Sequence, residues 1–460
     1  METILKQKRF GLATLVVLCV LVLLPKSASA TELWVDSCMG DDDGGANDCQ
    51  TEALPCATLG QAVSEITANN GDQVWATSGC MNAACGIMQC GAAVDFTEMV
   101  SLGAAQTGNG PGNQTRFDSW ESAGGKIREM PVIDCENTRD AGFWIGNNPG
   151  DPANYIGVGT FEIKNCLNSG VIGLPNSNYG DIEKVYSHDN AADGIRIDGS
   201  TAWYFYVNTL TDNGGYGIHY NSAINSKADA NLISGNDIGI YMSVNSTGHD
   251  ITNNWIEGST SYGIQVVGNS NNIVNNTTYE NGTGEIRVGN DVDAPVSNTT
   301  ILNNILNVQS NYGIMVECNA NTNLSSNFND IYRDGGGMTG WWGPSGGCTG
   351  INSPNLGSWQ ANSGGDANSI ETDPDFTNPG VGPAINATSP AVNTGTDASA
   401  WTTTDIHAQS RPIGAGWEMG ADERYGPAEG PGIPEFSLVT LVIAFGLGLG
   451  TFGYVRIKKS

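Results

Sequence analysis

The sequence predicts an all-β chain whose central part is a solenoid of parallel strands, with rungs of roughly 22 residues and a capping helix at the N-terminal end. Three observations predict this fold. A Gly-Ile dipeptide or a close variant recurs along the chain, apolar and polar residues alternate after each glycine, and asparagines recur at a similar interval. Self-similarity at a fixed interval is typical of repeat architectures, and alternation with period two is typical of strands.

The glycine repeat occupies the middle of the chain. Its members are Gly170-Val171, Gly194-Ile195, Gly217-Ile218, Gly239-Ile240, Gly263-Ile264, Gly284-Glu285-Ile286 and Gly313-Ile314. After Gly194, the apolar residues Ile195 and Ile197 flank Arg196, so alternate side chains are expected on opposite faces of a strand. A β-propeller or an antiparallel sandwich is the alternative, but a propeller repeat is about twice as long.

The asparagine column predicts a stack of side chains inside the solenoid. It consists of Asn254, Asn276, Asn304 and Asn327, each of which follows a short apolar run. Side chains at equivalent bends of stacked strands can share hydrogen bonds along the axis. We therefore expect these asparagines to form a ladder.

Both ends of the repeat region carry further signals. Leu59, Ala62, Val63 and Ile66 form an apolar stripe at helical spacing, which predicts a helix covering the open end of the stack. With the preceding segment from residue 33, and with DPDF at 373–376, SPAVNTGTD at 389–397 and TDIHAQSRPIGAGWEMGADE at 404–423, residues 33–424 resemble surface proteins of the pectate-lyase-like superfamily. The resemblance implies a right-handed parallel β-helix.

The two termini predict export and anchoring. Residues 1–30 combine a basic start, a short apolar run and Ala28-Ser29-Ala30, which is typical of a signal peptide, with an N-terminal membrane anchor as the alternative. Residues 436–455 are apolar and precede a basic tail, so they predict a membrane span. With Pro434-Glu435-Phe436-Ser437, this tail resembles signals processed by exosortase- or archaeosortase-type sorting enzymes; a permanent anchor is the other interpretation.

The expected organisation has six parts, and the body of the chain is expected outside the cytoplasm. They are a signal peptide (1–30), a disulfide-rich cap with the first rungs (31–130), the β-helix repeats (131–332), a loop insertion with C-terminal rungs and cap (333–425), a linker with the sorting-like motif (426–435), and the membrane anchor with its tail (436–460).

The net charge limits the binding partners of the chain, and the cysteines indicate its cellular compartment. A net charge of −29 argues against binding to nucleic acid, whose phosphates attract cationic proteins. Cysteines are expected to form disulfides after export, and their pairing is left open; a Cys318–Cys348 bridge near the C-terminal end is one of the alternatives. Beyond the signal peptide they are Cys38, Cys49, Cys56, Cys80, Cys85, Cys90, Cys135, Cys166, Cys318 and Cys348.

The outward positions of the repeat carry the candidate chemistry. In a solenoid, the residues that follow each Gly-Ile pair stack on one face, and polar and aromatic groups together suit sugar rings. The predicted carbohydrate-binding strip consists of Arg196, His219, Tyr241, Gln265, Arg287, Tyr216 and Tyr262, with Trp341 and Trp342 from a loop at 335–348 that breaks the repeat. The two tryptophans either form a sugar platform or pack over the last rungs.

The stretch SHDNAADGIRIDG at 187–199 is one rung of this scaffold and concentrates further polar groups. Resemblance to polysaccharide lyases implies that Arg196 and His219 act as base and carboxylate partner, with His188 as a second base. It also implies Ca²⁺ held by the carboxylates of Asp189, Asp193 and Asp198.

Two functions are therefore expected. The first is a non-catalytic, cell-surface protein that binds glycan or builds the envelope. The second is a polysaccharide lyase, hydrolase or epimerase that acts on acidic polysaccharide.

Overall fold

The computed structural model describes residues 30–37, 49–50, 55–68, 70–78, 95–110, 113–119, 130–146, 150–290, 295–318, 320, 322–343 and 349–424. The predicted signal peptide (except Ala30), the linker, the membrane anchor and Cys38, Cys80, Cys85, Cys90 and Cys348 lie outside these residues. Within them, no helix has the length and hydropathy needed to span a membrane.

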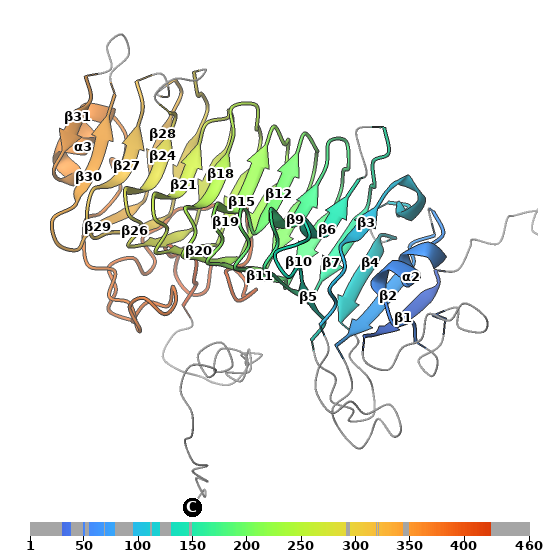
Figure 1. Cartoon of the computed structure of the whole chain (residues 1–460). Helices are drawn as coiled ribbons and strands as arrows, with labels where there is room; N and C mark the ends of the chain where they lie inside the picture. The colour runs from blue at the N-terminus through green and yellow to red at the C-terminus, as the bar shows by residue number, and fades with distance from the viewer. Residues whose placement is uncertain are drawn as a thin grey trace, which may run out of the picture.

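The chain winds through three sheets in turn, and Figure 1 shows their strands stacked side by side along one axis. Within the described residues, the first sheet contains β1 (Glu32–Asp36), β2 (Gln73–Thr77), β4 (Thr115–Ser119), β7 (Ile156–Gly159), β10 (Asp181–Glu183), β13 (Tyr204–Tyr206), β16 (Lys227–Asp229), β19 (Asp250–Thr252), β22 (Asn272–Val274), β25 (Thr300–Leu302) and β28 (Ser325–Asn327).

The second sheet contains β5 (Val132–Asp134), β8 (Glu162–Lys164), β11 (Tyr186–His188), β14 (Thr209–Thr211), β17 (Leu232–Ser234), β20 (Trp255–Glu257), β23 (Thr277–Tyr279), β26 (Ile305–Val308) and β29 (Asp330–Arg333). The third contains β3 (Val100–Leu102), β6 (Ala141–Ile145), β9 (Ser169–Gly173), β12 (Ile195–Asp198), β15 (Tyr216–Asn221), β18 (Ile238–Met242), β21 (Tyr262–Val266), β24 (Gly284–Val288), β27 (Tyr312–Val316), β30 (Met338–Trp342) and β31 (Ile351–Ser353).

Neighbouring strands are parallel except at the β30–β31 pair, which is antiparallel. The predicted parallel β-helix is therefore confirmed, and the crossover rule for parallel strands makes its coil right-handed. Helix α2 (Leu59–Glu65) contacts β1 and β3 at the N-terminal end, as the apolar stripe predicts, and helix α3 (Leu356–Ser363) contacts β30 and β31 at the other end. A short 3₁₀ helix, η2, spans Ala104–Gln106.

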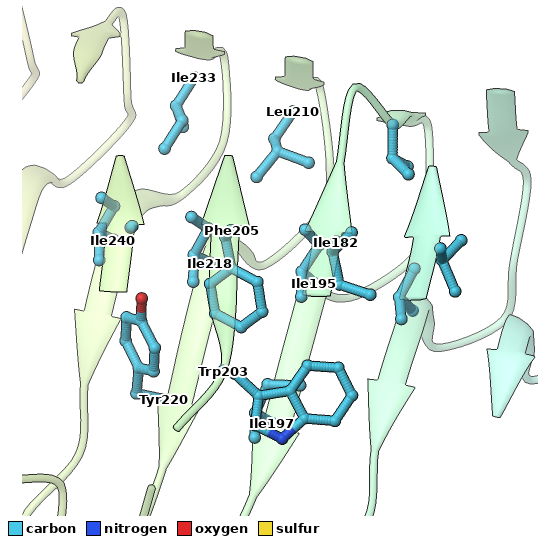
Figure 2. Close-up of a cluster of buried hydrophobic side chains, with 14 of the residues drawn as sticks. Ile182, Ile195, Ile197, Trp203, Phe205, Leu210, Ile218, Tyr220, Ile233 and Ile240 are labelled. Atoms are coloured by element: carbon cyan, nitrogen blue, oxygen red, sulfur yellow. The ribbon is translucent and has the colours of Figure 1, made fainter. Parts of the chain in front are cut away.

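The Gly-Ile repeat is explained by close packing between rungs. A Cβ added to Gly217 would lie 2.6 Å from the carbonyl oxygen of Gly239, and one added to Gly239 would lie 2.5 Å from that of Gly263. These distances are too short for any other residue without moving the backbone of the next rung. The following isoleucines stack inside the coil, where Ile195, Ile218 and Ile240 are fully buried, as Figure 2 shows.

The asparagine ladder forms at the corner between the first and second sheets. Its members are Asn208, Asn231, Asn254, Asn276, Asn304 and Asn329, which donate from Nδ2 to Oδ1 of the next member. The expected end at Asn327 is wrong, because this residue lies on β28 opposite Leu302, whereas Asn329 occupies the corner. The last step of the ladder, from Asn304 to Asn329, is 25 residues long.

Replacing Asn254 by alanine is expected to lower the free energy of unfolding by about 3 kcal/mol. Its Oδ1 accepts from the backbone N–H and the side chain of Asn231, and its Nδ2 donates to Ala228 and Asn276, so the change leaves several buried polar groups unsatisfied. Urea denaturation measures the loss. The exposed Asn245→Ala is the control and should cost less than about 0.5 kcal/mol; equal losses would contradict the role of the ladder.

A histidine holds the equivalent position at the corner between the third and first sheets. His249 is fully buried, its Nδ1 accepts from Ser226 N at 3.1 Å, and its Nε2 donates to Ala223 O at 3.0 Å. The backbone N–H of His249 donates to Asn271, so the histidine continues a polar column. Burial lowers the pKa of His249 to about 4. The backbone hydrogen bonds to Ser226 and Ala223 raise this pKa, but their effect is smaller than that of burial.

This lowered pKa predicts a pH-dependent loss of stability. The unfolded chain binds a proton at His249 below its ordinary pKa of 6.5, whereas the folded chain binds it only near 4, so stability falls as pH falls through this window. The penalty reaches about 3 kcal/mol at pH 4. His249→Asn keeps a hydrogen-bonding side chain without a titrating group. The measurement is the wild-type minus variant free energy of unfolding against pH, and a flat difference would contradict the prediction.

A C-terminal strap, defined as residues 366–424, folds back along the corner between the first and second sheets (Figure 1, orange to red). Three corner asparagines with positive φ donate from Nδ2 to it: Asn253 to the Thr402 hydroxyl, Asn275 to the Glu418 carbonyl, and Asn303 to the Thr396 carbonyl. Phe376 packs edge-on against Trp255 and Tyr279. The strap therefore covers this corner, and it also reaches the third sheet at β30, where the Thr339 hydroxyl donates to Glu371.

Two disulfides join described cysteines. Cys49 is bonded to Cys56, and Cys135 to Cys166, a pair separated by 31 residues in the sequence. Cys318 is also disulfide-bonded; its expected partner Cys348 lies outside the described residues. The expectation that cysteines pair is therefore confirmed for these residues.

Candidate active site

Three predicted residues lie side by side on the outer face of the third sheet. Arg196 on β12 lies opposite His219 on β15, which in turn lies opposite Tyr241 on β18. The alternation that buries Ile195 and Ile218 directs these side chains outward. The expected register is therefore confirmed, and the three groups form a row along the solenoid axis.

His219 is oriented by a buried carboxylate. Asp193, in the corner before β12, has a side chain only 5% exposed; its Oδ2 lies 3.0 Å from His219 Nδ1, and its Oδ1 accepts from Tyr216 N at 2.9 Å. In neutral His219, this contact places the proton on Nδ1 and the lone pair on Nε2. A positioned imidazole with a lone pair is suited to act as a general base.

Aromatic rings restrict the imidazole of His219. The Tyr216 ring meets it edge-on at a centroid distance of 4.8 Å, and the Tyr241 ring lies at 5.3 Å. The two tyrosine rings also contact each other, at 4.7 Å. Burial, followed by the nearby Tyr241 and Asp193, raises the pKa of Tyr216, so its phenol stays protonated at neutral pH.

Arg196 presents a cation beside His219. Its Nε donates to Asp198 Oδ1 at 2.9 Å, and Asn221 Nδ2 also donates to this oxygen at 2.8 Å. The side chain is 30% exposed, so part of the guanidinium faces solvent. Since arginine remains protonated in proteins, Arg196 is suited to bind a carboxylate and His219 to act as the base.

The predicted strip is less accessible beyond Tyr241. Gln265 is only 6% exposed and donates to Gly289 O, so little of its side chain is accessible to a ligand. Arg287 makes two hydrogen bonds to Glu317, and its guanidinium lies over the Tyr262 ring at 5.1 Å. These contacts hold Arg287 and Tyr262 to each other.

His188 and Asp189 belong to a different part of the molecule. His188 lies on β11 of the second sheet, with Nε2 3.2 Å from Glu162 and Nδ1 2.7 Å from Asp189. Burial opposes protonation, but the hydrogen bonds to both carboxylates raise the pKa of His188 above its usual value. With both nitrogens bonded, His188 lacks the lone pair required of the predicted second base.

The three aspartates predicted to hold Ca²⁺ do not converge. Asp189 contacts His188, Asp193 contacts His219, and Asp198 contacts Arg196. Across the described part of the chain, no group of three or more histidine, cysteine or acidic side chains could hold a metal ion. These residues therefore do not fit the calcium site that the resemblance implies.

The two tryptophans lie on a strand rather than in the expected loop. Trp341 and Trp342 belong to β30, opposite Met315 and Val316, so the repeat continues through this segment. Trp342 packs edge-on against the buried Trp359 of helix α3 at 5.8 Å. This contact favours the packing interpretation for Trp342.

A charged cluster on the first sheet was not predicted. Arg116 lies across Gly157, where an added Cβ would meet its side chain at 2.8 Å, and its Nη1 and Nη2 donate to Asp181 and Glu183. Arg116 also donates to Asp118 at 3.1 Å. Two glycines within one strand, at 157 and 159, are the sequence signal for this crossing.

Known proteins support the fold. A family model described as "Right handed beta helix region" matches residues 150–296. No curated protein matches the chain. The structure is similar to that of pectate lyase Pel9A, with a TM-score of 0.55 and 11% sequence identity over 87% of this chain and 98% of that chain.

Two further solved structures are similar at lower scores. An alginate lyase from Paenibacillus sp. str. FPU-7 has a TM-score of 0.46 and 16% identity over 65% of this chain and 94% of that one. The A-module of the Azotobacter vinelandii mannuronan C-5 epimerase AlgE6 has a TM-score of 0.45 and 13% identity over 75% of this chain and 92% of that one. At 11% identity, the similarity to pectate lyase Pel9A shows a shared fold and nothing finer.

Proposed function

We propose that this protein cleaves an acidic polysaccharide by β-elimination on the outer face of the third sheet. The observation that carries the proposal is the hydrogen bond from His219 to the buried Asp193, made directly beside the partly exposed side chain of Arg196. A fixed base next to a carboxylate-binding cation is what removal of the acidic C5 hydrogen of a uronate requires.

In this mechanism, Arg196 binds the uronate carboxylate with its solvent-facing nitrogens. Its charge stabilises the negative charge that develops on the carboxylate as the C5 hydrogen leaves. His219 removes this hydrogen through Nε2, and Asp193 stabilises the imidazolium that forms. Pectate lyase Pel9A has a similar fold and supports this choice by analogy.

Glycoside hydrolysis is less well supported by the same residues. Retaining and inverting hydrolases both use a pair of carboxyl groups around the scissile bond. Asp193 and Asp198 instead accept hydrogen bonds from His219 and Arg196, so both carboxylates are engaged in orienting a neighbour. The arrangement therefore favours elimination over hydrolysis.

The test is a spectroscopic assay on the purified full-length protein. Elimination creates a C4–C5 double bond conjugated with the carboxylate, which absorbs ultraviolet light. We expect absorbance to grow with at least one 4-linked uronate polysaccharide, with calcium or with a chelator present. An unchanged absorbance across a broad uronate panel would contradict the proposal.

Glycan binding without catalysis is the second candidate. The observation that favours it is the contact between the rings of Tyr216 and Tyr241, which offers aromatic surface beside the polar row. Retention on a glycan array together with a silent absorbance assay would support this function instead.

We also propose that the protein is exported and held at the cell surface. The Cys49–Cys56 and Cys135–Cys166 bonds support an oxidising compartment. The signal-like residues 1–30 and the apolar residues 436–455 support secretion followed by anchoring, with or without a sorting enzyme.

A further inference from the structure

The row of Arg196, His219 and Tyr241 has an order that matches the atoms of a uronate. Parallel strands lie about 4.8 Å apart, and the three residues occupy successive strands at one register position. In a 4-linked uronate, C5 carries both the carboxylate and the hydrogen that leaves, and the neighbouring C4 carries the glycosidic oxygen. With the carboxylate at Arg196 and the hydrogen at His219, the C4 oxygen is directed toward Tyr241.

We infer that Tyr241 is the general acid of the reaction, and that the substrate is therefore a 4-linked D-glucuronate or D-mannuronate rather than a D-galacturonate or L-guluronate. The inference rests on the proposed function, since it assigns the acid and the substrate class of the same site. It adds to the proposed function by naming the group that protonates the leaving oxygen, and it places that group and the base on the same sheet.

The proposed step balances as a β-elimination. His219 Nε2 takes the C5 proton, the electrons of the C5–H bond form the C4–C5 double bond, and the bond from C4 to the glycosidic oxygen breaks. The leaving oxygen takes the phenolic proton of Tyr241. The phenolate and the imidazolium then return to their starting forms by proton exchange with solvent, so no oxidant, reductant or other reactant is consumed.

The stereochemistry follows from the sheet. His219 and Tyr241 project from the same face, with ring centroids 5.3 Å apart, so both reach the same side of a sugar ring lying against them. Base and acid on one side require the C5 hydrogen and the C4 oxygen to be cis. This holds in 4-linked D-glucuronate and D-mannuronate, whereas the two groups lie on opposite faces in D-galacturonate and L-guluronate.

The experiment compares four polymers with the full-length protein at equal uronate concentration. We expect ultraviolet absorbance to grow with a 4-linked D-glucuronate polymer or with poly-D-mannuronate, and to stay unchanged with polygalacturonate and poly-L-guluronate. Growth only on the latter pair would overturn the stereochemical inference while leaving elimination intact. Silence on all four would overturn this inference together with the proposed function.

A matched set of variants tests the role of Tyr241. Tyr241→Phe should lower kcat on the polysaccharide by about 10²-fold or more, because the leaving oxygen loses its proton donor. It should retain near wild-type activity on a uronate whose C4 carries an acidic phenol, since such a leaving group needs no protonation. Equal losses on both substrates would contradict the assignment of Tyr241 as the acid.

Tyr312→Phe is the control on the same sheet. The Tyr312 hydroxyl donates to Asn352 Oδ1 at 3.2 Å, away from the row. This variant should keep wild-type activity on both substrates. Circular dichroism confirms that each variant remains folded, so that a loss of activity reports on chemistry.

Discussion

His219→Gln is expected to abolish elimination activity, with a loss in kcat of about 10³-fold or more. Glutamine retains a polar side chain of similar reach but has no lone pair basic enough to remove a carbon-bound proton, so the general-base contribution of about 10²–10⁴-fold is lost. The measurement is the initial rate of ultraviolet absorbance increase under saturating substrate. The loss of activity in His219→Gln should be the same whatever the leaving group, whereas the loss in Tyr241→Phe should depend on it.

Asp193→Asn is the companion change. Its amide can still accept from Tyr216 N, but it removes the negative charge behind His219 and lets the imidazole adopt either tautomer. We expect kcat to fall while substrate affinity stays near the wild-type value. His188→Gln, on the second sheet, should leave activity unchanged. Comparable losses from His188→Gln and His219→Gln would exclude His219 as the specific base.

Arg411→Gln is expected to produce the largest loss of stability in the strap, about 3–5 kcal/mol. The side chains of Arg411 and Glu423 are fully buried and lie 2.7 Å apart, and Arg411 also donates to Gly420 O at 2.8 Å. Removing the cation leaves the Glu423 carboxylate buried without its charge partner. Burial, followed by the neighbouring Glu423, raises the pKa of Glu418 above its usual value.

Limited proteolysis and urea denaturation measure this effect. Cleavage within residues 366–424 should become much faster in Arg411→Gln, and the unfolding midpoint of the strap should fall. The control is Arg333→Gln, which breaks an ion pair with Glu371 whose arginine is 32% exposed; it should cost less than about 1 kcal/mol. Wild-type protease resistance in Arg411→Gln would contradict the importance of the buried pair.

The repeat could be predicted from sequence because each rung encodes its own position. Gly217 and Ile218 return in the next rung as Gly239 and Ile240, so the register of Arg196, His219 and Tyr241 follows directly from the alternation. The ladder end at Asn327 was misplaced because the ladder steps vary between 22 and 28 residues, so Asn327 and Asn329 both fit the spacing and periodicity cannot choose between them.

Contacts between a corner and a strand could not be predicted in the same way. Asp193 reaches His219 from the preceding rung, and the path of the corner, which no periodic pattern encodes, decides this contact. The contacts of the strap are harder still to predict from the sequence. Asn253 and Thr402, for example, are 149 residues apart and belong to segments without a common pattern. The burial of Gln265 was also missed, because its contact with Gly289 O, just after the neighbouring strand β24, does not follow from alternation.

The asparagine ladder has a consequence for how the length of such a protein can change. Asn231 and Asn254 occupy equivalent positions in successive coils. Removing or duplicating one complete coil therefore joins the chain at equivalent positions, and it preserves the contacts between the other coils. Partial excisions would instead set aliphatic side chains against solvent. The strap is hydrogen-bonded to Asn253, Asn275 and Asn303 in three successive coils. Adding or removing a coil between these residues would break its contacts. Natural variation in length is therefore expected nearer the N-terminal end, before residue 206, because Tyr206, Val207 and Lys227 already contact the strap.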